Sequence, residues 1–193
     1  MKSFRSPAGQ CESRAFEEVL TEHLDALYRT ALRFSHGRAA DAEDLLQDAL
    51  LRAFERFHEL REPAAARAWM FTILTRTNLN RLRSRRRRPD AHLTDLDEHE
   101  FEKALAEWQP LDEADAFGES TVLPDEIAAA LDALADHLRQ VVWLSDVEGF
   151  RQREVAEMLG VPEGTVASRL YRARRQLRES LRHAAPSSVV RRA

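Results

Sequence analysis

The sequence predicts an all-α protein with two small helical domains, joined by a flexible acidic linker. Ala, Leu, Arg and Glu dominate the composition, and only 6 of the 193 residues are glycine, which favours helices. Apolar residues recur every three or four positions in two separate blocks, as in amphipathic helices. Between the blocks, residues 89–126 carry 13 acidic and 1 basic side chain. A chain of this length can form two small domains.

The charge distribution divides the chain further. The net charge of −4 argues against a nucleic-acid partner, but residues 15–88 and 127–193 each carry 3 more basic than acidic side chains, so both blocks can face an anionic partner. We expect a flexible leader over 1–12, an N-terminal bundle of three to four helices over 13–88, the linker over 89–123, a C-terminal helix-turn-helix domain over 124–183 and a flexible tail over 184–193.

Two helices open the N-terminal block. Apolar residues spaced by three and four predict a helix from about Phe16 to Phe34, with Gly37 as a stop. Asp41 then begins a second helix, whose first turn also holds Glu43 and Asp44. The helix dipole favours carboxylates at that end. The apolar face of this helix comprises Leu45, Leu46, Ala49, Leu50, Ala53, Phe54 and Phe57.

A third helix follows the break at Pro63, a residue type suited to a helix start. It is expected from about Ala64 to Ser84 and ends in a run of arginines. Its predicted inner side comprises Trp69, Met70, Ile73 and Leu74. In the linker, Pro110 and Gly118 interrupt long helices, so we expect at most a short helix around 98–108.

The C-terminal block carries a helix-turn-helix pattern. Ile127, Leu131, Leu134 and Leu138 form one helical stripe. Further along, a short helix over 154–159 precedes Gly160, which permits a left-handed turn. Val161 would fill the angle between the helices. A second helix buries Val166, Leu170, Ala173 and Leu177. This is the arrangement of helix-turn-helix DNA readers.

The outer face of that second helix suits DNA. Thr165, Ser168, Arg172 and Arg175 project opposite the apolar stripe, and hydroxyls and guanidinium groups can bond base edges. Arg169 and Arg174 lie on the flanks and suit phosphates. The competing interpretation is a solvated basic face on a bundle helix. The Gly-Val-Pro-Glu-Gly-Thr-Val turn, residues 160–166, favours DNA binding.

Three motifs together resemble the extracytoplasmic-function (ECF) sigma factors, the two-domain type of the primary sigma family. Residues 41–54 (Asp-Ala-Glu-Asp-Leu-Leu-Gln-Asp-Ala-Leu-Leu-Arg-Ala-Phe) are similar to the helix that binds the β′ clamp helices of RNA polymerase. Ala68-Trp69-Met70, with Ile73, resembles the start of the promoter-melting helix. Residues 131–181 resemble the promoter-binding C-terminal domain.

The resemblance implies a function. The chain would bind core RNA polymerase, read the minus-thirty-five promoter element as duplex with its C-terminal domain, and capture flipped bases of the minus-ten element with its N-terminal domain. No apolar run approaches the roughly 20 residues needed to span a bilayer, and the N-terminus lacks the apolar region of a signal peptide, so we expect a cytoplasmic protein. The resemblance also implies an anti-sigma factor that holds the chain inactive. It implies no catalytic residue, metal, cofactor, membrane insertion or small-molecule substrate.

The same resemblance assigns three sets of residues. Polymerase contacts are expected from Asp41, Asp44, Leu45, Gln47 and Asp48. Minus-ten contacts are expected from Arg67, Trp69, Arg76, Asn80, Arg81 and Arg83. Minus-thirty-five contacts are expected from Thr165, Ser168, Arg169, Tyr171, Arg172 and Arg175.

The chain departs from the family pattern at three places. Thr75-Arg76-Thr77 stands where many members have Arg-Asn, the loop over 62–67 is short, and Ala167 replaces a common basic residue. We therefore expect altered promoter preferences at both elements.

Two other classes of protein remain as alternatives. An ordinary helix-turn-helix regulator would bind palindromic DNA as a dimer without polymerase, but the acidic helix and the melting-helix pattern count against it. A hydrolase or nuclease needs convergent acids and bases or a metal cluster, and the sequence suggests none. The single cysteine, Cys11, cannot form an intramolecular disulfide, and the seven histidines lack zinc-site spacing.

Overall fold

A computed structural model describes residues 7–86 and 125–184, with side chains over 13–85 and 125–182. Every regular element in these two ranges is helical, so the all-α prediction is confirmed. The chain divides into two compact units, one ending after the third helix and the other containing the C-terminal helices. The expected linker helix over 98–108 lies outside the described residues, as do the linker's other features.

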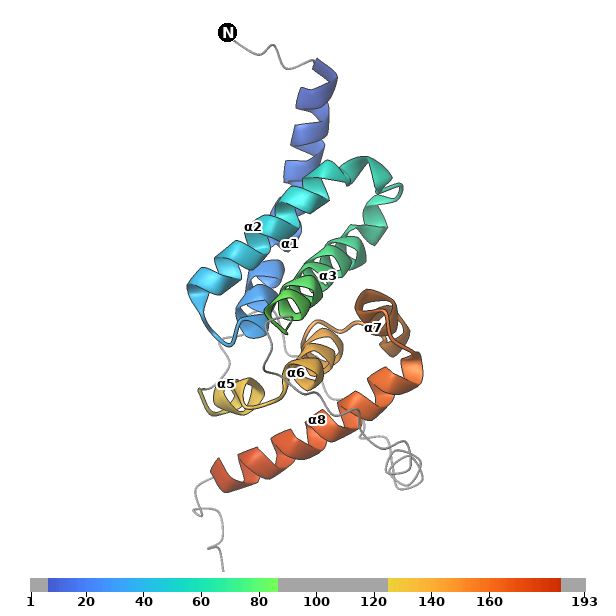
Figure 1. Cartoon of the computed structure of the whole chain (residues 1–193). Coiled ribbons are helices and arrows are strands. Elements are labelled where there is room, and N and C mark those ends of the chain that lie inside the picture. The colour runs from blue at the N-terminus through green and yellow to red at the C-terminus, as the bar shows by residue number, and fades with distance from the viewer. Residues whose placement is uncertain (1–6, 87–124, 185–193) are drawn as a thin grey trace, which may run out of the picture. The chain divides into compact units, whose positions relative to one another are not determined.

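The N-terminal unit is a three-helix bundle (Figure 1). Helix α1 spans Pro7–Phe34, α2 spans Ala39–Glu55 and α3 spans Ala66–Arg86, with 3-10 turns at Phe57–Glu59 and Pro63–Ala65. Each helix packs against the other two. The best-buried apolar side chains of the bundle are Leu27, Ala31, Ala42, Leu45, Phe71 and Leu74.

The turn between α1 and α2 places the acidic end of α2. His36 and Gly37 both have positive φ, 54° and 73°, and the Gly37 N–H donates to the Leu32 carbonyl at 2.9 Å. The predicted stop at Gly37 is therefore confirmed. Helix α2 begins at Ala39 rather than Asp41, so the carboxylate of Asp41 lies within the first turn, near the unpaired backbone N–H groups.

Two predictions about the other helices need correction. Helix α1 begins at Pro7, well before the start expected at about Phe16. Trp69 and Ile73 are only half-buried, whereas Met70, Phe71 and Leu74 are 2% exposed or less. Because α3 packs against both α1 and α2, its buried face lies to one side of the predicted one, and Trp69 comes to the surface edge.

The C-terminal unit contains four helices among the described residues: α5 at Asp125–Asp132, α6 at Asp136–Val142, α7 at Gln152–Leu159 and α8 at Glu163–Ala184. A π-helical turn, Trp143–Val147, continues α6. Helix α8 packs against α5, α6 and α7 (Figure 1). Its buried residues are Val166, Leu170 and Ala173, and the predicted Leu177 is half-buried.

The helix-turn-helix geometry is confirmed. Gly160 has φ 67° and ψ 39°, the left-handed region, and its N–H donates to the Ala156 carbonyl at 2.9 Å. The Val161 N–H donates to the same carbonyl at 3.1 Å. At the other end of α7, the Glu154 carboxylate accepts from the Arg151 N–H at 2.8 Å, which caps the helix.

A buried arginine in this unit was not predicted. Arg139 is 1% exposed, and its guanidinium donates to the Asp136 carboxylate at 2.5 Å and to the Asp132 carbonyl at 3.3 Å. A buried guanidinium is tolerated only when its donors are paired. Arg139 therefore holds the α5–α6 corner against which α8 packs.

Candidate functional site

The N-terminal half of α2 presents an acidic face. Asp44, Gln47 and Asp48 are exposed, and Asp41 is half-buried. Leu45, predicted to contact polymerase, is instead 1% exposed inside the bundle, because it lies on the apolar stripe that faces the other helices. We correct that assignment and name Asp44, Gln47 and Asp48 the acidic face of α2.

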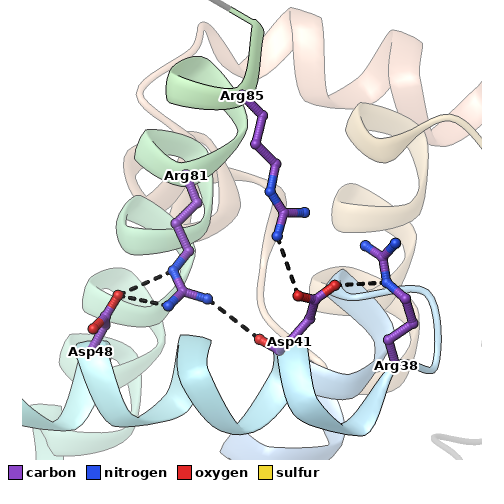
Figure 2. Close-up of polar contacts among 5 residues, drawn as sticks. All are labelled: Arg38, Asp41, Asp48, Arg81 and Arg85. Carbon is purple, nitrogen blue, oxygen red and sulfur yellow. Dashed lines mark hydrogen bonds and ion pairs between the residues drawn. The ribbon is translucent and has the colours of Figure 1, made fainter.

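Arginines of the same unit engage two of the predicted acids (Figure 2). The Asp41 carboxylate pairs with Arg38 Nε at 2.7 Å and with Arg85 Nη2 at 3.4 Å. Asp48 Oδ2 accepts from Arg81 Nε at 3.1 Å and from Nη2 at 2.7 Å. Arg81 and Arg85 lie on α3, so ion pairs join the end of α3 to the start of α2.

Other acidic-face residues have no such partner. Within the described ranges, no hydrogen bond or ion pair engages the side chains of Asp44 and Gln47. Both oxygens of Asp41 are engaged, whereas Asp48 uses one of its two. Asp44, Gln47 and the second oxygen of Asp48 are therefore the acceptors that this face leaves available to a partner.

A hollow of about 660 Å³ lies between the end of α2 and α3. Three predicted minus-ten residues, Trp69, Arg76 and Asn80, are on its wall. The full lining is Arg52, Glu55, Arg56, Glu59, Trp69, Thr72, Ile73, Arg76, Thr77 and Asn80. The hollow thus combines an aromatic ring, an amide and three guanidinium groups, which suit bases and a phosphate backbone, with two carboxylates, Glu55 and Glu59, on the α2 side.

Arg52 and Arg56 were missed by the sequence interpretation. They lie four residues apart, Arg52 in the last turn of α2 and Arg56 directly after it, so both are on one side of the helix end, and that spacing was the available signal. The sequence does not show that these two arginines lie opposite α3, because that depends on how α2 and α3 pack in the bundle.

The remaining minus-ten candidates lie elsewhere. The Arg67 guanidinium stacks 5.1 Å from the centre of the Phe71 ring. Arg83 is exposed, and no described residue pairs with its side chain. Arg81 turns toward α2 instead.

Helix α8 carries all six minus-thirty-five candidates. Thr165, Ser168, Arg169, Tyr171 and Arg172 are half-buried and Arg175 is exposed. The Ser168 hydroxyl donates to the Thr165 carbonyl at 2.9 Å, so toward DNA it can serve as an acceptor. Arg175 pairs with Glu179 at 3.2 Å, with both side chains exposed. No described residue pairs with the Arg172 side chain.

Arg174, expected on the phosphate-binding flank, is engaged within the fold. Its Nη2 and Nε donate to the two carboxylate oxygens of Asp146 at 2.6 and 3.0 Å. Hydrogen bonding to Asp146 raises the pKa of Arg174 above its ordinary value. This bidentate pair fixes α8 to the π-helical turn, so the guanidinium of Arg174 is engaged in holding α8 in place.

Other kinds of site find no support in the described ranges. No three His, Cys, Asp or Glu side chains there gather as metal ligands, and none of the helices combines the length and apolar character needed to cross a membrane.

Comparison with known proteins matches both units to one family. The family model described as Sigma-70 region 2 matches residues 19–88, and that described as Sigma-70, region 4 matches residues 125–177. The ECF RNA polymerase sigma factor SigL of Mycobacterium tuberculosis is 34% identical over 177 residues, which cover 91% of this chain and 94% of that protein. SigE of Mycolicibacterium smegmatis is also 34% identical, and the match covers 92% of this chain and 66% of SigE.

Solved structures agree. The sigma factor RpoE of Bartonella quintana, in complex with the anti-sigma factor NepR, is 25% identical with a TM-score of 0.63, covering 92% of this chain and 99% of that one. CnrH, in complex with the cytosolic domain of CnrY, is 24% identical with a TM-score of 0.59, which supports the shared fold. With regions 2 and 4 present in order and a relative such as SigL matched over nearly its whole length, the chain belongs to the family of ECF RNA polymerase sigma factors.

Proposed function

We propose that this ECF sigma factor binds core RNA polymerase through the acidic face of α2 and reads promoter DNA with two other surfaces. Those surfaces are the hollow between α2 and α3 and the exposed side of α8. The observation that carries the proposal is the acidic face itself. Asp44 and Gln47, on a helix inside the region 2 match, are exposed and keep their acceptors unused by the described residues.

The polymerase contact is electrostatic in this proposal. Carboxylates on a rigid helix attract a basic surface, and complementary charge speeds and orients the encounter. Leu51, on the same helix, is 61% exposed. We include it as an apolar contact, since a large exposed aliphatic side chain beside the charges gains from burial against a partner.

We assign the minus-ten element to the hollow. Trp69 offers a ring for stacking, Asn80 offers an amide that can bond a base edge, and Arg76 offers charge to the backbone. On the α2 side, Arg52 and Arg56 offer further guanidinium groups to the backbone, beside the carboxylates of Glu55 and Glu59. Arg83 continues it along α3, and Arg67 approaches from the start of that helix.

We assign the minus-thirty-five element to α8, the second helix of the helix-turn-helix. In this motif the N-terminal part of the second helix enters the major groove. Thr165, Ser168 and Arg172 occupy that part, and the unpaired guanidinium of Arg172 suits the two acceptors of a guanine. Arg169, Tyr171 and Arg175 would contact the flanking backbone.

We further propose that the chain acts in the cytoplasm without catalytic chemistry, and that an anti-sigma factor controls it. One similar solved structure holds the sigma factor RpoE in complex with the anti-sigma factor NepR, and another holds CnrH in complex with the cytosolic domain of CnrY. A partner of this kind would cover the α2 or α8 surfaces. Purified products of genes adjacent to this one should include a protein that binds the chain and blocks its binding to polymerase.

The polymerase assignment is tested by titrating fluorescently labelled full-length chain with bacterial core RNA polymerase. The proposal expects saturable binding that Asp44→Arg reduces and that Glu163→Arg, on the C-terminal unit, leaves intact. Absence of binding, together with tight binding of a palindromic duplex by the chain alone, would favour an independent regulator instead.

A further inference from the structure

We propose that Arg81 is a positioning residue of the polymerase interface, which acts through Asp48 and does not contact DNA. The proposal rests on the assignment of the acidic face of α2 to polymerase. It reassigns a residue that the sequence pattern places on the DNA-binding helix.

The geometry of Arg81 turns its whole guanidinium toward α2 (Figure 2). Nε and Nη2 donate to Asp48 Oδ2 at 3.1 and 2.7 Å, and Nη1 donates to the Asp41 carbonyl at 3.4 Å. The side chain is 28% exposed. To reach a phosphate, Arg81 would have to give up all three hydrogen bonds and leave the Asp48 carboxylate unpaired.

Asp48 can serve Arg81 and a partner at once. Both Arg81 bonds reach Oδ2, and Oδ1 accepts no hydrogen bond from any residue that the structure describes. The Asp48 side chain is 51% exposed. A carboxylate has about four lone-pair directions, so a polymerase cation can approach Oδ1 while Arg81 holds Oδ2.

Holding the carboxylate in place favours binding. An exposed Asp side chain samples several rotamers. Restricting it to one rotamer on binding costs conformational entropy and lowers the affinity for the partner. Two bonds from one planar guanidinium fix the carboxylate before polymerase arrives. A lysine would supply a single mobile donor in place of this fixed pair.

Arg83 provides the matched comparison on the same helix. It lies two residues beyond Arg81, is exposed, and has no partner among the described side chains. If the basic end of α3 contacts DNA, Arg83 is free to do so and Arg81 is not. Substitution of Arg81 should therefore affect polymerase binding, whereas substitution of Arg83 should affect promoter binding.

The experiment uses the full chain in two assays. The first measures the affinity of Arg81→Ala, Arg81→Lys and Arg83→Ala for core polymerase. It repeats Arg81→Ala in the Asp48→Ala and Asp44→Ala backgrounds. The second measures promoter binding by holoenzyme preassembled at saturating sigma factor. All measurements are made where urea titration shows each variant to be fully folded, so lost stability alone cannot lower the affinity.

We expect Arg81→Ala to weaken polymerase binding roughly two- to fivefold, the range of a part-exposed ion pair. The same factor should appear in the Asp44→Ala background and disappear in the Asp48→Ala background. Arg81→Lys should recover part of the loss. Promoter binding by the preassembled holoenzyme should be unchanged by Arg81→Ala and weakened by Arg83→Ala.

Two results would overturn the proposal in distinguishable ways. In the first, Asp48→Ala weakens polymerase binding, but Arg81→Ala lowers only promoter binding or lowers polymerase binding equally in every background. The positioning role of Arg81 is then wrong, and the assignment of the acidic face to polymerase stands. If Asp48→Ala and Asp44→Ala both leave polymerase binding unchanged, the polymerase assignment fails and the role of Arg81 fails with it.

Discussion

At the scale of single residues, the helix-turn-helix depends on one left-handed position. Gly160 has φ 67°, and a Cβ added there would meet no atom within 4 Å. Substitution would therefore cost conformational strain without a steric clash, since L-residues pay roughly 1–2 kcal/mol in this region.

We predict that Gly160→Ala destabilises the C-terminal unit by about 1 kcal/mol, because restriction of the unfolded chain offsets part of the strain. Gly164→Ala is the matched control. Gly164 lies within α8, has no positive φ and has equally open surroundings, so Ala should be neutral or slightly stabilising there. Hydrogen exchange of the α7 and α8 amides measures both, and equal effects would contradict this account of Gly160.

Arg172 is the sharpest single-residue test of promoter reading. We predict that Arg172→Ala weakens binding to a minus-thirty-five duplex by about 1–3 kcal/mol, the value of one good base contact. Arg178→Ala is the control, because Arg178 is exposed on the same helix but lies well past the turn. Anisotropy titrations of holoenzyme with labelled duplex measure the change, and an unaltered affinity for Arg172→Ala would remove this residue from the readout.

The sequence predicts those residues whose positions depend on local spacing, but not those that depend on contacts far along the chain. Gly160 and the buried stripe Val166, Leu170 and Ala173 follow from local spacing, and the structure confirms them. Leu45 was rightly placed on the apolar face, but its burial conflicts with its assignment as a polymerase contact, and the pairing of Arg174 with Asp146 conflicts with its assignment to phosphate. Local spacing separates the faces of a helix, but it does not show that Arg174 meets Asp146, 28 residues earlier.

At the scale of elements, the pair between Arg174 and Asp146 connects α8 to the π-helical turn. We predict that Arg174→Ala and Asp146→Ala each destabilise the C-terminal unit. A double-mutant cycle should give a coupling near 1 kcal/mol, since the pair is bidentate but about one-third exposed. Chemical unfolding followed at α8 provides the free energies. Additive effects of the two substitutions would show that the pair does not couple these elements.

Helix α2 gives the corresponding test for polymerase. We predict that Asp44→Arg weakens binding to core polymerase roughly tenfold or more, because it places like charge against a basic surface. The free energy of unfolding should change little, since Asp44 is exposed and no described residue pairs with it. Asp48→Arg should abolish polymerase binding. It would also place a cation beside Arg81 and so lower the free energy of unfolding. Normal holoenzyme assembly by Asp44→Arg would contradict the assignment of the acidic face.

Helix order was predictable and helix boundaries were less so. The sequence pattern predicts α1, α2, α3, α7 and α8, because each carries an amphipathic stripe or a turn residue. It predicts one helical stripe from Ile127 to Leu138, which the structure divides into α5 and α6. The π-helical turn at Trp143–Val147 has no such signal. The hollow could not be predicted either, since it forms where Arg52 and Arg56, at the end of α2, lie across from Trp69 and Asn80 of α3.

At the scale of the whole molecule, two units carry separate tasks in one chain. As an ECF sigma factor, the chain binds core RNA polymerase and directs promoter-specific transcription initiation. The acidic face of α2 and the hollow belong to one unit, and the recognition helix belongs to the other. Separate promoter elements can therefore be read by units with independent cores, and substitutions in one unit should leave the stability of the other unchanged.

The most direct test of the central claim is reconstituted transcription. Purified chain and bacterial core RNA polymerase are mixed with a genomic fragment library, and the 5′ ends of new RNA are mapped. We predict defined start sites that appear only with the chain, that share two upstream sequence elements, and that are lost with Asp44→Arg. Start sites that are the same with and without the chain, using core polymerase from its own host, would contradict the claim that it is a promoter-specificity subunit.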